Sequence, residues 1–391
     1  MRFVFAAFFM LMLHSGLAQL FKEEEMITQP ESENDDKQLI LLVELTRHGA
    51  RSPIGSPDQL LNTTWNIGKG QLTRSGERQH YLQGVRMRKK YIDQAKFLPD
   101  VFNPQNFYIM STDYNRTIMS AFAQMQGLYP LGKGGSFVDS KRRDSSVPPF
   151  TITDQAKSII ASNDVLPNKY VPYPIHVAEL STDNFLRGYD ESKCLIIRKY
   201  KKDSLEEANA RSKEELTTLY DELFTKFKVP KEKLNLVDAE MYIDTYVMAK
   251  FEGMKFEKDL SVVAQNLVRT YYKYLYYDGI FGNPQTARLS ANNFLRYLNE
   301  NIKAKVEAFK GNATATEFHK NIKHIYFSAH DTTLAGFLSA IGQAEKQVSL
   351  PPLASLILIE VYKREEKFYL NWNYNGEYLN INGECTKDGE C

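Results

Sequence analysis

Residues 47–53 are the part of the chain richest in groups that can bind an anion. They read Arg-His-Gly-Ala-Arg-Ser-Pro and place two guanidinium groups and one imidazole within five positions. A guanidinium matches two phosphate oxygens with paired hydrogen bonds, and Gly49 lets the backbone approach a ligand closely. A single segment of this kind is more often a solvated basic turn, so its interpretation depends on what else the fold brings to it.

Two later segments carry groups of the same kind. Arg116 lies about one turn into a predicted helix, whose N-terminus attracts anions. His330 and Asp331 lie between a predicted strand and the helix that follows it. Two histidines among three arginines cannot both be comfortable cations, so one of them can stay neutral and nucleophilic. Three junctions with such groups are hard to explain as packing and predict one shared phosphate site.

Each of these segments follows a short apolar run that reads as a buried strand: 39–43, 107–110 and 325–329. In open α/β sheets, ligands bind beyond the carboxyl ends of the strands. Helices are expected at 73–91 and 332–341, and a closing hairpin at 355–362 and 367–372. The order predicts an α/β core in 19–130 and 279–391, with an inserted, mainly helical cap in 131–278.

Charge and the first residues limit the possible partners and the compartment. The 49 basic and 48 acidic residues give a net charge of +1, which argues against nucleic acid or a polybasic membrane contact. Residues 1–18 combine Arg2, an apolar run and a small-residue end at Ala18, which predicts a cleaved signal peptide. An N-terminal anchor is the alternative, but the apolar run is short. No membrane span is expected in the mature chain.

The cysteines suit an oxidising compartment. Cys385 and Cys391 can close a small loop, which leaves Cys194 either free or paired between chains. There is no spacing of two cysteines and two histidines, so we predict no metal site.

Three sequons stand at Asn62, Asn115 and Asn312. Asn62 and Asn312 lie in polar stretches and can carry glycans. Asn115 adjoins Arg116, where a glycan would crowd the predicted site, so we expect that sequon to be unused.

The three segments, in order and spacing, resemble the motifs of the histidine acid phosphatase family within the histidine phosphatase superfamily. Residues 47–53 match the superfamily motif, and 111–121 and 328–333 resemble the second and third blocks of the animal prostatic and lysosomal acid phosphatases. Residues 70–73 and 174–194 are similar as well. The likeness covers most of the mature chain and implies a phosphoglycerate-mutase-like core sheet flanked by helices.

The resemblance implies hydrolysis of phosphate monoesters in two steps, without a cofactor. His48 would attack phosphorus and become phosphohistidine. Asp331 would protonate the leaving oxygen and then take a proton from the attacking water. Four side chains would bind the phosphoryl oxygens: Arg47, Arg51, Arg116 and His330.

The same resemblance implies a secreted or lysosomal (vacuolar) enzyme with an acid optimum. Its substrates would be small phosphomonoesters, with phosphorylated peptides as a further class, and a homodimer is expected. The animal relatives carry more cysteines and several bridges, so the pairing of Cys194 stays open.

Three other functions compete with this interpretation. A phytase or inositol-polyphosphate phosphatase needs extra basic residues around the cleft, and the predicted cap shows no lysine-rich pocket pattern. A mutase places its acid elsewhere and does not explain a signal peptide. A phosphatase that only binds its ligands would lack His48 or Asp331, and both are present.

The remaining histidines are not assigned to the site. His80 is expected to be solvated on a charged helix face, and His176 to have a structural role. His319 and His324 are placed near a lysine-rich helix end. The tyrosines between 271 and 277 are too dense for one face and should pack at a domain or subunit boundary.

Overall fold

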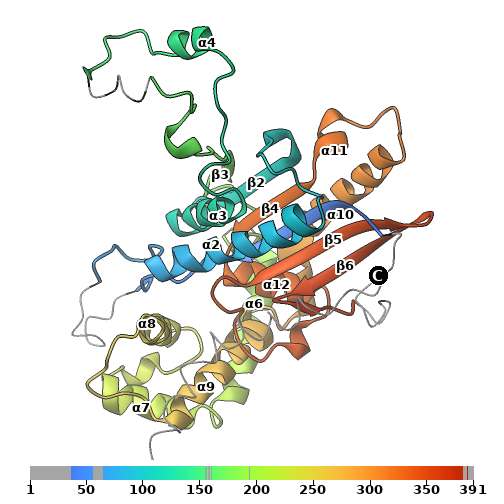
Figure 1. Cartoon of the computed structure of the whole chain (residues 1–391). Coiled ribbons are helices and arrows are strands. Elements are labelled where there is room, and N and C mark those ends of the chain that lie inside the picture. Colours follow the sequence, from blue (N-terminus) through green and yellow to red (C-terminus); the bar gives the residue numbers. More distant parts are fainter. Residues whose placement is uncertain are drawn as a thin grey trace, which may run out of the picture.

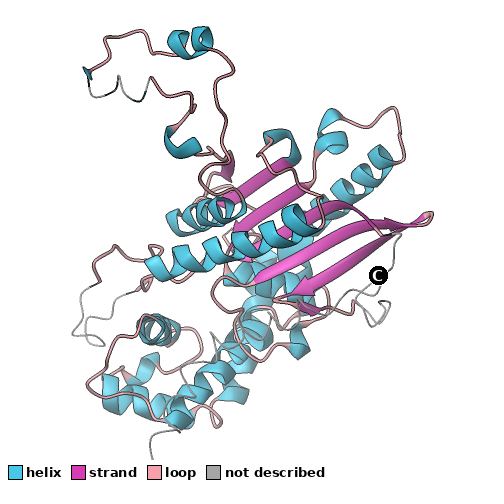
Figure 2. Cartoon of the chain, viewed as in Figure 1, coloured by secondary structure: helices cyan, strands magenta, loops and turns pink. Residues whose placement is uncertain are grey.

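The computed structural model describes residues 37–55 and 65–381, except 155, 157–158, 160 and 193, and also residue 385. Its centre is a mixed sheet with strand order β3-β2-β4-β1-β5-β6-β7 (Figure 2). The first four of these strands are parallel, and β5, β6 and β7 extend the sheet by antiparallel pairing. The strands are β1 (Gln38–Arg47), β2 (Phe107–Thr112), β3 (Ile175–Ala178), β4 (His324–Ala329), β5 (Leu356–Arg364), β6 (Lys367–Tyr374) and β7 (Glu377–Tyr378).

Helices cover both faces of this sheet (Figure 1). One face carries α2 (Arg74–Arg88) and α3 (Asn115–Leu128), and the other carries α10 (Pro284–Phe309) and α12 (Asp331–Ala340). Along β1, Leu42 packs on the side of α2 and α3, whereas Leu45 packs with Phe294 of α10 and Phe337 of α12. The apolar run at 39–43 is therefore buried on both faces, and the predicted α/β fold is confirmed.

The range 131–278, expected to form one inserted helical cap, lies in two places (Figure 1). Its first part holds α4 (Ser140–Ser145) on a segment that extends away from the sheet, and its strand β3 pairs with β2 inside the sheet. Its later part is helical, from α6 (Leu195–Ser212) to α9 (Val262–Lys273), and forms an apolar cluster that also includes Ala287 of α10 and Ala335 of α12. The remaining helical elements are η1 (Lys89–Gln94), η2 (Pro104–Asn106), η3 (Pro167–Lys169), α7 (Thr217–Phe227), η4 (Lys231–Lys233), α8 (Glu240–Phe251), η5 (Tyr274–Ile280), α11 (Glu317–Asn321) and η6 (Ala344–Lys346).

Several sequence predictions fall on residues that the structure does not describe. The signal peptide at 1–18, the sequon at Asn62 and the cysteine Cys391 all lie outside the described residues. Among the described residues, Cys194 is a free, partly buried thiol, and none of the helices is long and apolar enough to span a membrane.

Candidate active site

The three predicted segments meet at one edge of the sheet because the strands that carry them are parallel neighbours. In the register of β1 and β4, Arg47 lies opposite Ala329, and in the register of β2 and β4, Ser111 lies opposite Ser328. The backbone amide of His48 donates to the carbonyl of Ala329 at 3.0 Å. The residues that follow these strand ends are therefore neighbours in space, although they come from positions 48, 113 and 330 of the chain.

His48 is oriented as a nucleophile. Its side chain is buried, and its Nδ1 lies 2.8 Å from the carbonyl oxygen of Gly49. A carbonyl can only accept, so Nδ1 carries the proton and Nε2 is left with its lone pair. Burial, followed by the charges of Arg47 and Arg116, holds the pKa of His48 well below its usual value. The ring therefore stays neutral in acid, where an ordinary histidine would be a cation.

His330 and Arg116 lie next to this nucleophile. The rings of His48 and His330 are 5.6 Å apart between centroids, and Arg116 Nη2 lies 3.5 Å from His330 Nδ1. Burial and the charge of Arg116 hold the pKa of His330 well below its usual value. The Arg116 guanidinium stacks on the ring of Tyr114 at 4.3 Å, and burial lowers its pKa only to about 10. Arg116 is thus a cation in acid, whereas both histidines are neutral.

Asp331 is the first residue of α12 and pairs with Arg47. Its Oδ2 lies 2.7 Å from Arg47 Nη2, and its Oδ1 accepts from the backbone amide of Thr332 at 2.8 Å. Burial raises the pKa of Asp331, but Arg47, Arg51 and His330 outweigh burial and hold this pKa below its usual value. The carboxyl group is therefore ionised in the empty site.

Arg51 has a partner that the sequence analysis missed. Its Nη1 and Nη2 donate to the two carboxylate oxygens of Asp244 on α8, at 2.9 and 2.8 Å. Glu240 lies one turn earlier on α8 and accepts from the hydroxyl of Tyr276 at 2.8 Å. Burial, with the charges of Asp331 and Asp244, raises the pKa of Glu240 to about 7. Two carboxyl groups four residues apart in an otherwise largely apolar helix were the sequence pattern that could have revealed this face.

Replacing Asp244 with asparagine is expected to strengthen anion binding. The change removes one negative charge beside the fork of Arg51 while the amide oxygen can still accept from it. At a few ångströms and an intermediate dielectric constant, this favours a bound anion by roughly 1–2 kcal/mol, or about 10-fold. The inhibition constant of inorganic phosphate at pH 5 should therefore fall by about that factor.

The matched control is Asp259→Asn, which removes the partner of Lys250 at the far end of the same helix. Its inhibition constant for phosphate should equal that of the unmodified protein. An unchanged or raised constant in Asp244→Asn would show that Asp244 does not act on the anion site.

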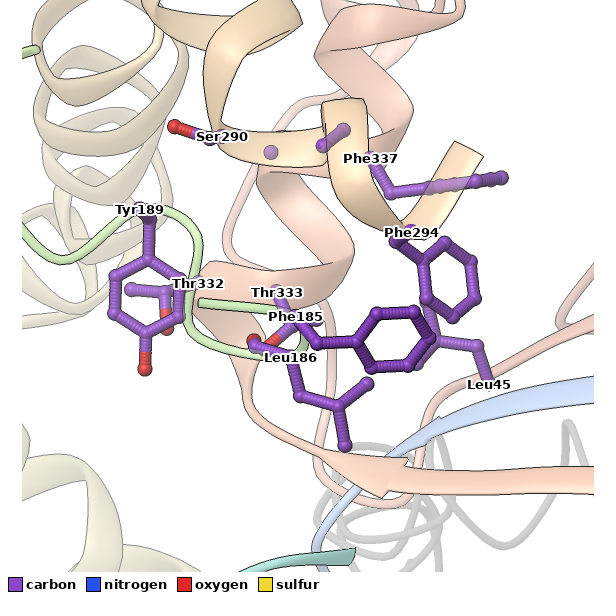
Figure 3. A pocket seen from close by; sticks show the side chains of 11 residues that line it. Leu45, Phe185, Leu186, Tyr189, Ser290, Phe294, Thr332, Thr333 and Phe337 are labelled. Carbon is purple, nitrogen blue, oxygen red and sulfur yellow. The ribbon is translucent and has the colours of Figure 1, made fainter. Parts of the chain in front are cut away.

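The start of α12, which carries Asp331, is held by close packing. The hydroxyl of Thr333 donates to the carbonyl of Leu186 at 2.8 Å. Figure 3 shows the small cavity of about 10 Å³ that remains beside this turn, with Leu45, Phe185 and Phe294 on one side and Tyr189 with Thr332 on the other. A volume of this size holds at most about one water molecule, so the cavity is a packing feature rather than a substrate site.

The other histidines are placed as follows. His80 was predicted to be solvated, and this is wrong: it is fully buried, and its Nε2 lies 3.0 Å from the carbonyl oxygen of Arg47. His324 was predicted near a helix end, and it instead begins β4, buried, 2.9 Å from Glu44. His319 does lie in the last turn of a helix, α11. His176 stacks on Tyr108.

Two further observations concern metal ligands and the tyrosines between 271 and 277. Among the described residues there is no cluster of histidine, cysteine and carboxylate side chains that could hold a metal ion. Four tyrosines of the dense run are buried in the apolar cluster of the helical region: Tyr271, Tyr272, Tyr276 and Tyr277.

Comparison with known proteins shows the family to which the chain belongs. The model of the histidine phosphatase superfamily (branch 2) matches residues 38–375. The chain belongs to this superfamily. It is 26% identical over 352 residues to prostatic acid phosphatase of Mus musculus, covering 88% of this chain and 80% of the relative. It is also 26% identical over 323 residues to lysosomal acid phosphatase of Xenopus laevis, covering 82% and 65%.

Two solved phytase structures share the fold. The phytase from Citrobacter braakii aligns with a TM-score of 0.59 at 14% identity, over 90% of this chain and 95% of that one. The phytase from Hafnia alvei aligns with a TM-score of 0.58 at 15% identity, over 92% and 95%. At such identities the likeness concerns the fold alone. The superfamily and the acid phosphatase relatives indicate that the chain is a phosphatase.

Proposed function

We propose that this phosphatase hydrolyses phosphate monoesters in acid through a phosphohistidine at His48. The observation that carries the proposal is the state of His48, which is buried, neutral and oriented through Nδ1, so that its Nε2 lone pair is available. Arginine side chains from two strand ends surround it and would neutralise the charge of the transferred group.

In the first step, the Nε2 lone pair of His48 forms a bond to phosphorus while the ester P–O bond breaks. Arg47, Arg51, Arg116 and His330 bind the phosphoryl oxygens. For His330 to donate through Nδ1, its Nε2 must accept, and the hydroxyl of Thr112 lies 2.9 Å from Nε2 and can donate to it. Because a guanidinium can only donate, the 3.5 Å contact of Arg116 Nη2 with His330 Nδ1 must open when the phosphoryl group binds. The leaving oxygen takes a proton from Asp331 and departs as an alcohol.

In the second step, water attacks the phosphohistidine. Asp331 takes a proton from the water as the new P–O bond forms and the N–P bond breaks, which restores neutral His48 and releases phosphate. Asp331 is therefore protonated both at the start of the first step and at the end of the second.

The charge of the empty site explains an acid optimum. Asp331 is ionised beside Arg47 when the site is empty, yet the first step needs its proton. A bound phosphate offsets the arginines and raises the pKa of the carboxyl group, or the substrate brings the proton itself as a monoanion. The second ionisation of a phosphomonoester lies near pH 6, so either route loses efficiency as the pH rises through about 6.

Arginine removal is expected to be costly and not additive. Arg51→Ala or Arg116→Ala should each lower kcat/KM by roughly 10²–10³-fold, as does the loss of one donor to a developing oxyanion. The double variant should lose less than the product of the two, because both arginines act on one group.

The design must allow for Asp244, because Arg51→Ala leaves this buried carboxylate unpaired. The cycle is therefore measured in the Asp244→Asn background as well. Strict additivity of Arg51→Ala and Arg116→Ala in both backgrounds would contradict a shared phosphoryl site.

The second candidate function is that of a phytase or inositol-polyphosphate phosphatase. The phytase structures share the fold of this chain. The charges around the clamp favour the monoesterase. Asp244 already neutralises Arg51, and Glu240 on the same helix face adds no positive charge. A polyanion would therefore find little unpaired positive charge on this side, whereas a single phosphoryl group is matched by the arginines present.

The test is phosphate release from four substrates with chelator present. Purified protein is given an aryl phosphate, a sugar phosphate, a phosphotyrosyl peptide and phytate at acid and neutral pH. The proposal predicts turnover of the monoesters in acid and little release from phytate. Faster release from phytate than from the monoesters would favour the second candidate.

The proposal extends to the compartment. Export is supported by the leader-like residues 1–18, and the named relatives are prostatic and lysosomal enzymes. Asn312 is exposed at the surface and accepts from the hydroxyl of Thr314 in its own sequon at 2.8 Å. Glycosylation, a Cys385–Cys391 bridge and a homodimer belong to the same proposal.

A further inference from the structure

A group of buried polar side chains lies between the sheet and the helices α2 and α3. We call it the Glu44 network. Each member is at most 1% exposed, and none belongs to the phosphate site. The members are Glu44 of β1, His324 and Tyr326 of β4, Gln124 of α3 and His80 of α2.

Hydrogen-bond contacts join the members into one path. The two carboxylate oxygens of Glu44 lie against His324 Nε2, at 2.9 Å, and the side-chain amide of Gln124. The Gln124 oxygen accepts from the hydroxyl of Tyr326 at 2.9 Å and lies 3.0 Å from His80 Nδ1. The other ring nitrogen of His80, Nε2, lies 3.0 Å from the carbonyl oxygen of Arg47.

The path ends on the peptide group that joins Arg47 to His48. The carbonyl of this peptide faces His80, and its N–H, which belongs to His48, donates to Ala329 at 3.0 Å. The peptide plane is therefore held from both sides. The side chains of Arg47 and His48 branch from the two ends of this plane, so its orientation sets the directions of both.

Burying Glu44 is otherwise hard to explain. A carboxyl group without exposure costs free energy unless its oxygens are bonded, and an apolar side chain at this place between packed layers would avoid that cost. His80 Nε2 must carry a proton, because the Arg47 carbonyl that it faces can only accept. Burial lowers the pKa of His80. Glu44 reaches this ring through Gln124, whose side-chain amide group lies between the Glu44 carboxylate and His80 Nδ1.

We propose that His80 is a positioning residue for the nucleophile, and that Glu44 holds it in place through Gln124. His80 fixes the Arg47–His48 peptide and so aims the His48 Nε2 and the Arg47 guanidinium at the same phosphoryl group. This inference rests on the proposed function, because it assigns His48 as the reacting group.

The test compares two replacements of His80. His80→Leu removes the donor to the Arg47 carbonyl and should lower kcat about 10- to 100-fold, the loss typical of a displaced reacting group, with KM changed less than about 3-fold. His80→Gln keeps an N–H that can reach the same carbonyl and should recover most of that loss. The rate of phosphoenzyme formation in single turnover should follow kcat.

Met87→Ala is the matched control. Met87 lies on the same helix face, buried among the apolar side chains between α2 and the sheet. It should lower the melting temperature and leave kcat unchanged well below that temperature. If His80→Leu does not fold, Glu44→Gln replaces it in the test, because this change keeps the shape of the side chain. Glu44→Gln should also lower kcat.

The outcomes separate the inference from the function on which it rests. If the unmodified protein forms phosphohistidine while His80→Leu and Glu44→Gln turn over like Met87→Ala, the positioning role is wrong and the proposed function stands. A protein without phosphohistidine would overturn both. A fall in kcat that His80→Gln does not recover would show a general packing role instead.

Discussion

Replacing His48 with alanine is expected to abolish turnover while leaving the phosphate site able to bind. Loss of a nucleophile typically costs about 10⁴- to 10⁶-fold in kcat, because no other group can take over its bond to phosphorus. Among the described residues, the His48 side chain makes one hydrogen bond, to its neighbour Gly49, so the fold should be intact. Steady-state rates and the melting temperature measure the two effects.

Phosphate binding by this variant distinguishes loss of the nucleophile from loss of the phosphate-binding site. Arg51, Arg116 and His330 are unchanged in His48→Ala, so inorganic phosphate should still bind, as calorimetry can show. A variant that keeps more than about one hundredth of the original kcat would contradict the role of His48.

Asp331→Asn is expected to act very differently on two classes of substrate. An alkoxide from glycerol phosphate is strongly basic and leaves poorly without a proton, whereas nitrophenolate is stable by itself. General acid catalysis contributes about 10²–10⁴-fold where it is needed. The variant should therefore lose about that factor in phosphoenzyme formation from glycerol phosphate and far less from nitrophenyl phosphate.

Single-turnover kinetics are required here, because both substrates share the second step, in which Asp331 also acts. The variant keeps Arg47 bonded to the carbonyl of Pro351, at 2.5 Å, so the arginine is not left without a partner. The decline of the rate at higher pH should flatten for nitrophenyl phosphate. An equal loss on both substrates would demote Asp331 from proton donor to an electrostatic or structural part of the site.

The fold and the phosphate site could be predicted because their patterns are local. The run at 39–43 has no polar residue, so only a strand buried on both faces fits it. The helix expected at 73–91 does begin there, and the Thr73 hydroxyl accepts from the amide of Gly76 at 3.1 Å. Chemistry-bearing residues directly after parallel strands must meet at one edge, so sequence order alone brings His48 and His330 together.

His80 was misjudged because glycines hide the buried face of its helix. The buried positions of α2 include Gly76, His80, Gly84 and Met87, and a hydrophobicity pattern does not register the two glycines. Gly84 lies against Gly127 of α3 so closely that a Cβ there would meet the backbone of that helix within 3 Å. Close packing of two helices, and not apolar character, buries this strip.

Asp244 was missed for a different reason. It is 193 positions away from Arg51, and no local pattern connects a helix of the later region to the first strand end. The acidic pair of α8 can be seen in the sequence, but only the folded chain shows that it faces the phosphate site. The same limit applies to Glu44 and His324, which pair 280 positions apart.

Trapping the phosphoenzyme tests the central claim most directly. The unmodified protein is mixed with substrate labelled in its phosphoryl group, quenched in alkali without acid, and digested to locate the label. The account predicts a label that survives alkali, is lost in acid, lies on the peptide that contains His48, and is absent from His48→Ala. A label that resists acid and is released by alkali, or one on another residue, would contradict it.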